Sequence, residues 1–166
     1  MNADKTFVPD LKVQLEAMGR LSFLVGEWAG EASVLRGPGH FVELVQTESA
    51  QFKADGLVLM IEGIGTAKAD GSVALMALGL ISFDDAAGVY RMRAFNDGRW
   101  LETEVVLGEG QSMSWGFALG AIRTRTVLTV KNGEWTERGE ITFGDRAPVR
   151  MMDLVVRRAT NRPPSS

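Results

Sequence analysis

Near the N-terminus, the spacing of apolar residues predicts one short helix. Leu11, Leu15 and Met18 fall on one face when the chain is read at the helical period. Asp10 suits the first turn, because an acidic side chain there faces the positive end of the helix dipole. Gly19 follows the last apolar residue, and we expect it to end the helix in a left-handed conformation.

Beyond residue 28 the pattern changes to an alternation of apolar and polar residues in short runs. Turn sequences such as "NDG" at residues 96–98 and "NG" at residues 132–133 separate these runs. Roughly ten runs at a spacing of roughly 8–12 residues are typical of an all-β protein. Each run can pair with its sequence neighbour to form an antiparallel meander. Closing the sheet into a barrel is the most effective way for such a meander to avoid exposed edge strands. We therefore predict an all-β fold, a single up-and-down antiparallel β-barrel of roughly ten strands with a short N-terminal helix.

The turn at residues 132–133 sets the register of one hairpin. It places Lys131 opposite Glu134 and, counting back, Arg125 opposite Glu140. Pairs of opposite charge on one face are typical of a solvated exterior. The alternate positions of this hairpin are therefore expected to face the interior.

A second hairpin, turning at residues 97–98, pairs Arg93 with Glu102 and Arg91 with Glu104. We expect this charged face to lie outside. A slip of one residue would move every side chain to the other face. In that inverted register the four charges would line the cavity and become the prime catalytic or ligand-anchoring candidates.

The opposite face of these strands supplies the predicted cavity lining. A three-residue loop at residues 108–110 would set Met113 opposite Val105 and point the side chains of the following strand inward. The lining is then largely apolar with a few hydroxyls, as ligand pockets tend to be. The predicted ligand-binding residues are Tyr90, Met92, Thr103, Met113, Trp115, Phe117 and Thr124.

Length and composition restrict the function classes. The chain has 166 residues, 45% of them hydrophobic, which suits one domain. We assign residues 9–158 to that domain and expect residues 159–166 to be a disordered tail. The formal net charge of -3 gives no support for nucleic-acid binding. No apolar stretch has the length of a membrane span and no secretory signal is evident, so we expect a cytoplasmic protein. The sequence leaves a homodimer open.

Residues with catalytic or metal-binding chemistry are few. The absence of cysteine excludes disulfides, thiolate metal sites and cysteine nucleophiles. His40, the single histidine, lies in a turn beside Gly39, and no second histidine exists to share a metal. Asp84 and Asp85 also lie in a turn, where aspartate is favoured for local hydrogen bonds. The residues therefore predict no catalytic group, no metal site and no cofactor.

Four stretches carry a resemblance to a known group of proteins. They are "LSFLVGEWAGEASV" (21–34), "ISFDDAAGVYRMRAFNDG" (81–98), "MSWGF" (113–117) and "MMDLVVRR" (151–158). With the preceding helix, they resemble the calycins, which comprise lipocalins, fatty-acid-binding proteins and nitrobindin. They look most like uncharacterised bacterial lipocalin-like barrels close to nitrobindin.

The resemblance implies roles for residues of the first and last strands, at the base of the barrel. Gly26 would allow a close approach of the turn to the first strand, and Trp28 would close the barrel base. Arg157 or Arg158 would lie against the Trp28 indole as a cation–π lid. Strand parity leaves that choice open, and we assign the lid to Arg157.

Three functions remain after these arguments. The first is a binding module that holds a small apolar or amphipathic molecule in the barrel, without nucleic-acid or membrane partners. The second is an enzyme of the isomerase or cyclase type that acts on a hydrophobic substrate through Tyr90 or the Arg/Glu group. The third is haem binding, which the resemblance to nitrobindin implies through a histidine on a late strand. The matching region here has Met151 and Met152 instead. We favour the binding module.

Overall fold

Helix α1 (Leu11–Gly19) comes first in the computed structural model, which describes residues 7–159. Asp10 caps its N-terminus and accepts hydrogen bonds from the backbone N–H groups of Lys12 and Val13. The expected left-handed glycine at Gly19 is wrong. The cap residue Arg20 stays right-handed, because the chain runs directly into a 3₁₀ turn, η1 (Ser22–Leu24), without reversing.

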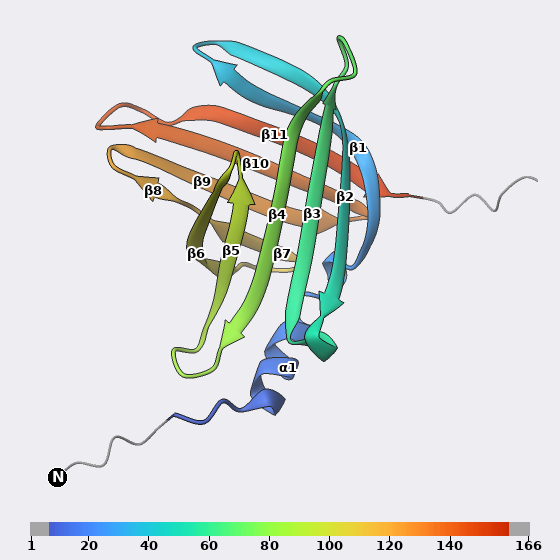
Figure 1. Cartoon of the computed structure of the whole chain (residues 1–166), viewed down its shortest axis with the longest axis vertical. Coiled ribbons are helices and arrows are strands. Elements are labelled where there is room, and N and C mark those ends of the chain that lie inside the picture. Colours follow the sequence, from blue (N-terminus) through green and yellow to red (C-terminus); the bar gives the residue numbers. More distant parts are fainter. Residues whose placement is uncertain (1–6, 160–166) are drawn as a thin grey trace, which may run out of the picture.

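Eleven strand segments follow, and the prediction of an all-β barrel with a short N-terminal helix is confirmed (Figure 1). The strands are β1 (Gly26–Gly37), β2 (His40–Lys53), β3 (Val58–Ala67), β4 (Val73–Asp84), β5 (Val89–Asn96), β6 (Arg99–Leu107), β7 (Ser112–Trp115), β8 (Ala118–Leu119), β9 (Ile122–Lys131), β10 (Glu134–Phe143) and β11 (Val149–Arg158). A second 3₁₀ turn, η2 (Ala54–Gly56), joins β2 to β3.

The strands pair antiparallel with their neighbours, and β11 pairs back with β1 to close the barrel. Ten strands form the wall, and the two-residue strand β8 adds to β9. Closure leaves no long edge strand exposed, which is how such a meander avoids pairing with other chains. The predicted tail falls mainly on residues 160–166, which lie outside the described residues.

The hairpin of β9 and β10 has the predicted register. Lys131 lies opposite Glu134, and Arg125 lies opposite Glu140. The predicted register of β6 and β7 is wrong, because Leu107 pairs with Met113 across a wider turn. A hydrogen bond from the Gly108 N–H to the Ser112 carbonyl holds that turn. The difference is an even number of residues, so the inward-facing side chains keep their parity.

The helical segments cover one end of the barrel, which we call the base. Met18, Leu21 and Leu24 are fully buried there. The Tyr90 hydroxyl donates to the Ala17 carbonyl at 2.7 Å and ties the wall to the helix. Figure 1 shows α1 beneath the ends of β3 and β4. The other end of the barrel carries only hairpin turns and is the open end.

Candidate functional site

Trp28 fills the base of the barrel. Its side chain is 1% exposed, and its ring meets the Trp135 ring edge-on with a centroid distance of 5.4 Å. The indole N–H donates to the Leu24 carbonyl at 2.9 Å. The one polar atom of this large buried side chain therefore has a partner.

Arg158 covers the outer side of Trp28. Its guanidinium carbon lies 4.3 Å from the centre of the indole ring, and Nη1 donates to the Val25 carbonyl at 2.7 Å. Gly26 leaves the space for this side chain. It has a φ of 136°, and a Cβ atom there would lie 2.7 Å from Arg158 Nη1.

The assignment of the lid to Arg157 is therefore wrong. Successive residues of a strand point to opposite faces, and Arg158 is the one that faces Trp28. Arg157 points to the exterior, where it pairs with Glu134 on β10.

Between the base and the open end, the barrel contains a cavity of about 280 Å³. Its wall is mostly apolar, with contributions from nearly every strand. The predicted residues Met92, Met113, Trp115, Phe117 and Thr124 all line it. Leu128, Leu154 and Ile61 close its sides.

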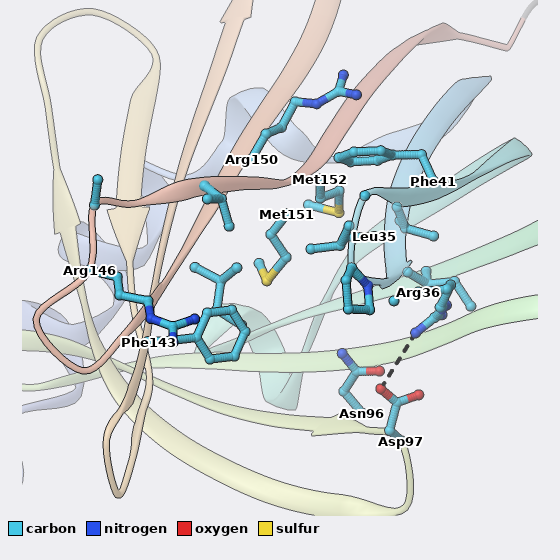
Figure 2. A pocket seen from close by; sticks show the side chains of 18 residues that line it. Leu35, Arg36, Phe41, Asn96, Asp97, Phe143, Arg146, Arg150, Met151 and Met152 are labelled. Carbon is cyan, nitrogen blue, oxygen red and sulfur yellow. Dashed lines mark ion pairs between the residues drawn. The ribbon is translucent and has the colours of Figure 1, made fainter.

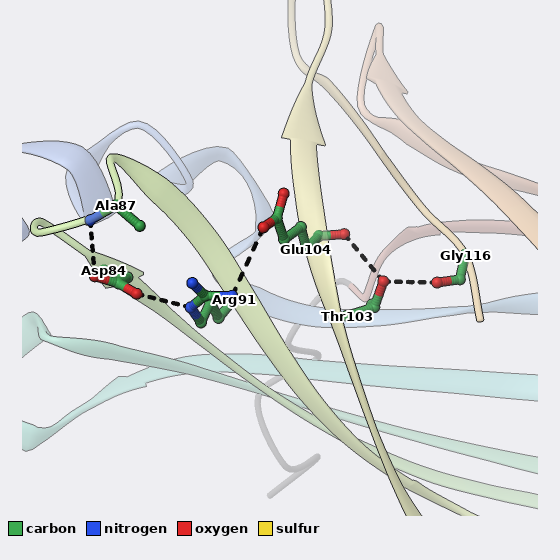
Figure 3. Close-up of polar contacts among 6 residues, drawn as sticks. All are labelled: Asp84, Ala87, Arg91, Thr103, Glu104 and Gly116. Carbon is green, nitrogen blue, oxygen red and sulfur yellow. Dashed lines mark hydrogen bonds and ion pairs between the residues drawn. The ribbon is translucent and has the colours of Figure 1, made fainter. Parts of the chain in front are cut away.

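Two predicted lining residues do not reach the cavity. Tyr90 is turned toward the base, where its hydroxyl bonds to the helix. The Thr103 hydroxyl donates to the Gly116 carbonyl at 2.6 Å, as Figure 3 shows. Each hydroxyl donates to a backbone carbonyl that lies far away in the sequence, so the sequence pattern does not reveal the contact.

The sequence prediction missed five polar side chains that line the cavity: Asn96, Thr126 and a group of three. Gln46 and Glu48 project from β2, and Glu137 projects from β10. Gln46 is fully buried, and Glu48 is 6% exposed. The Gln46 amide donates to Glu48 Oε1 at 2.7 Å, and the Trp135 indole N–H donates to Glu137 Oε1 at 3.0 Å. We call Gln46, Glu48 and Glu137 the acidic cluster.

Burial changes the titration of both carboxyl groups. It raises the pKa of Glu137 to about 7, although the hydrogen bond from Trp135 lowers it in part. Burial also raises the pKa of Glu48 well above its ordinary value, and the charge of Glu137 raises it further. The hydrogen bond from Gln46 opposes this rise. The cluster can therefore gain or lose a proton near neutral pH.

Glycines on β3 leave room for the cluster. A Cβ atom at Gly63 would lie 2.7 Å from Glu48 Oε1, and one at Gly65 would lie 2.5 Å from Gln46 Oε1. Any larger residue would have to displace these polar groups, since real Cβ atoms do not approach so closely. The two glycines thus determine where the polar end of the cavity can lie.

The cavity continues into a wider depression at the open end, which we call the mouth. The mouth has a volume of about 970 Å³ and shares Leu75, Asn96, Met151 and Met152 with the cavity. Figure 2 shows Met151 at its centre and Arg36, Arg146 and Arg150 around it.

The arginines at the mouth are only partly neutralised. Arg36 lies 3.9 Å from Asp97, and both residues of this ion pair line the mouth. Arg150 binds Asp153 at 2.7 Å and lies over the ring of Phe41 at 4.0 Å. The lining of the mouth contains three arginines and one carboxylate, so its local charge is positive.

The charged hairpin of β5 and β6 faces solvent, so the inverted register is excluded. Arg91 binds Asp84 at 2.8 Å and approaches Glu104 at 3.7 Å (Figure 3). Arg93 lies 3.4 Å from Glu102 in the predicted register. The hydrogen bond from Arg91 lowers the pKa of Asp84. These are exposed ion pairs, and they line no part of the cavity.

The residues of the cavity do not fit haem. Among residues 7–159, its lining includes no histidine, cysteine or tyrosine, and His40 is the exposed first residue of β2. Met151 and Met152 are present, but methionine usually ligates haem iron together with histidine. Among residues 7–159, no group of three or more His, Cys, Asp or Glu side chains could hold a metal ion.

Comparisons with known proteins support the fold. No protein-family model and no curated protein matches the sequence. Among solved structures, the chain is similar to Rv2717c from M. tuberculosis, with a TM-score of 0.67 and 14% identity over 88% of this chain and 97% of that one. It is also similar to the S-type phycobiliprotein lyase CPES from Guillardia theta, with a TM-score of 0.60 and 11% identity over 93% of this chain and 100% of that one. The chain thus shares an antiparallel β-barrel fold with these two proteins.

Another finding concerns the helices. In the described part of the chain, none is long and apolar enough to cross a membrane.

Proposed function

We propose that the barrel binds a small hydrophobic or amphipathic molecule in its cavity. The observation that carries this proposal is the cavity of about 280 Å³, lined by methionine and aromatic side chains and continuous with an open mouth. Concave, mostly apolar sites with a few polar groups are typical of small-molecule binding. One of the structurally similar proteins is a phycobiliprotein lyase. Its name supports the idea that a barrel of this fold can interact with another molecule.

We also propose the finer placement that the sequence predicts. Residues 9–158 form one domain, and the protein is cytoplasmic. The domain is related to the uncharacterised bacterial lipocalin-like barrels that are similar to nitrobindin. Its partner is a small molecule rather than nucleic acid or a membrane. The four sequence stretches that resemble this group support the placement, and so does the antiparallel β-barrel fold.

A fluorescence titration with the neutral, environment-sensitive dye prodan tests the binding proposal. We expect saturable binding with a blue shift, and we expect Trp115→Ala to weaken it by about tenfold, because the indole lines the cavity. Trp100→Ala is the matched control, since Trp100 is 44% exposed on the outer face. Equal binding by the wild type and Trp115→Ala would contradict the proposal.

Native mass spectrometry of protein purified without detergent provides an independent test. A molecule that co-purifies and leaves on denaturation would support the proposal, and its mass would begin to identify the ligand. Prodan binding unchanged by Trp115→Ala, together with a bare protein mass, would reject it.

Acid–base catalysis on the bound molecule is a second candidate function. The raised pKa of Glu137, about 7, favours it, because an acid or base works best near the ambient pH. The acidic cluster, rather than Tyr90, would supply the chemistry. If the protein is an isomerase or cyclase, the wild type should co-purify with its product or with no ligand. The Glu137→Gln variant should retain the unconverted substrate. Chromatography of extracts from the two proteins would distinguish the substrate from the product. Identical extracts from the two proteins would reject this function.

A further inference from the structure

We infer that the cavity is built for a ligand whose apolar body carries a basic nitrogen, held as an ammonium group by Gln46, Glu48 and Glu137. This inference rests on the proposed function and specifies the chemical class of its ligand.

The cluster has more acceptors than donors. Within residues 7–159, Glu48 accepts one side-chain hydrogen bond, from Gln46, and Glu137 accepts one, from Trp135. Gln46 Oε1 is fully buried and has no hydrogen-bond partner among the residues that the structure describes. A buried acceptor without a partner is rare in folded proteins, and it destabilises the structure that contains it. A molecule complementary to this end of the cavity must therefore present donors.

No side chain of the cavity supplies a positive charge. Among the described residues, 7–159, its lining contains no lysine, arginine or histidine, and the arginines of Figure 2 lie at the mouth. Two carboxyl groups without a cation nearby repel each other when both are ionised. An ammonium group carries three donors and one positive charge, so it offsets the repulsion and can reach several of these acceptors together.

The apolar wall suits the rest of such a ligand. Trp115 and Phe117 present aromatic rings to the same cavity, and an ammonium near an aromatic ring gains a cation–π contribution. Met92 and Met113 add flexible apolar side chains that adapt to the shape of a guest. The body of the ligand would occupy this part of the cavity.

Proton exchange gives the inference a distinct signature. Within the part of the chain that the structure describes, Glu48 on β2 and Glu137 on β10 are the only titratable residues of the cavity lining. Burial raises the pKa of Glu137 to about 7, so capture of an ammonium ion near neutral pH releases a proton from the Glu137 carboxyl group. Affinity for an amine therefore rises with pH up to about pH 7, where Glu137 of the free protein becomes ionised.

Calorimetric titrations with three probes of one shape test the inference: 4-phenylbutylamine, 4-phenylbutanol and 4-phenylbutyrate. We expect the amine to bind at least about tenfold more tightly than the alcohol near neutral pH, and the carboxylate to bind least. We also expect the amine affinity to rise by about tenfold between pH 5.5 and pH 7.5, while the alcohol affinity stays constant.

Variants then locate the effect. Glu137→Gln and Glu48→Gln keep the shape of the cavity, and each should reduce the preference for amine over alcohol by about tenfold. Glu102→Gln is the control, because it removes a carboxylate from the outer face, and it should leave the preference unchanged. Two variants are needed so that the loss of one through misfolding does not decide the result.

The outcomes separate the inference from the function on which it rests. Equal binding of the amine and the alcohol would overturn the inference and leave the proposed function intact. The tightest binding by the carboxylate would also overturn it, and would point to the arginines of the mouth. A preference for the amine that survives both glutamine variants would overturn the role of the acidic cluster. Failure of all three probes to bind would reject the proposed function together with the inference.

Discussion

The base and the cavity of this barrel are both lined by large buried side chains, but their polar groups differ in whether they have hydrogen-bond partners. At the base, the Trp28 indole N–H and the Arg158 guanidinium both donate to backbone carbonyls. In the cavity, Gln46 Oε1 has no partner among the described residues, and two carboxyl groups are buried beside it. Satisfied polar groups stabilise a fold, whereas unsatisfied ones weaken it. The difference indicates that the polar groups of the base stabilise the fold, whereas those of the cavity weaken it.

The largest expected effect comes from removing the aromatic side chain at the base. Trp28→Ala should lower the free energy of unfolding by about 3–5 kcal/mol, because it leaves a cavity where the ring packed and removes its contact with Trp135. Urea denaturation measures this change. Trp100→Ala, on the outer face, should cost about 1 kcal/mol or less. A loss as small as that for Trp28→Ala would contradict its role at the base.

The opposite change is expected when the polar groups of the cavity are removed. The double substitution Gln46→Leu/Glu48→Met replaces both partners of a buried hydrogen bond by apolar side chains of similar size. It should raise the free energy of unfolding near neutral pH by about 1–3 kcal/mol, since it also removes the unpaired acceptor and a buried acid. A clear loss of stability in urea denaturation would show that the cluster supports the fold, and would remove the contrast with the base.

The pH dependence of stability sharpens the comparison. The pKa of Glu137 is about 7 in the folded chain, above its unfolded value of about 4.3, so the folded state binds more protons between these values. The free energy of unfolding should therefore fall as pH rises from about 4.5 to about 7, by about 2–3 kcal/mol.

Urea denaturation at several pH values measures this decline. Glu137→Gln should make the decline smaller, because it removes one of the two buried carboxyl groups with a raised pKa and leaves the other, Glu48. Stability that is constant or rising across this interval in the wild type would contradict a carboxyl with a raised pKa.

The smallest effect is expected on the outer face. Arg91→Gln removes the ion pairs with Asp84 and Glu104, and it should change the free energy of unfolding by about 1 kcal/mol or less, because all three side chains are solvated. Binding of prodan should not change. A larger loss of either stability or binding would mean that this face is coupled to the interior.

The fold could be predicted well because it depends on local, repeated signals. Alternation of apolar and polar residues identifies strands, and a tight turn such as the one at residues 132–133 determines a register. The wider turn before Ser112 gave a wrong register, because loop length there depends on side-chain-to-backbone hydrogen bonds. Arg158 could not be distinguished from Arg157, since two adjacent residues differ only by strand parity.

The candidate site was predicted only in its apolar part. Met92, Met113 and Trp115 alternate with polar or small neighbours, so the alternation pattern predicts that their side chains point into the barrel. Gln46 and Glu48 also lie in phase with the buried Leu44 and Ala50, a signal that could have revealed the cluster. Glu137 lies in phase with Trp135 in the same way. Such polar residues are ordinarily assigned to solvent, and their burial depends on side chains from distant strands.

The ring of arginines at the mouth has a consequence for the speed of exchange. Arg36, Arg146 and Arg150 surround the opening through which any guest passes, so their field acts on the encounter before any contact in the interior is made. Added salt should therefore slow the arrival of an anion and speed that of a cation, while it leaves a neutral molecule unaffected. An amine that enters as its uncharged free base avoids the electrostatic repulsion by these arginines. The neutral amine should therefore enter the barrel fastest, whereas the ammonium form should dissociate most slowly.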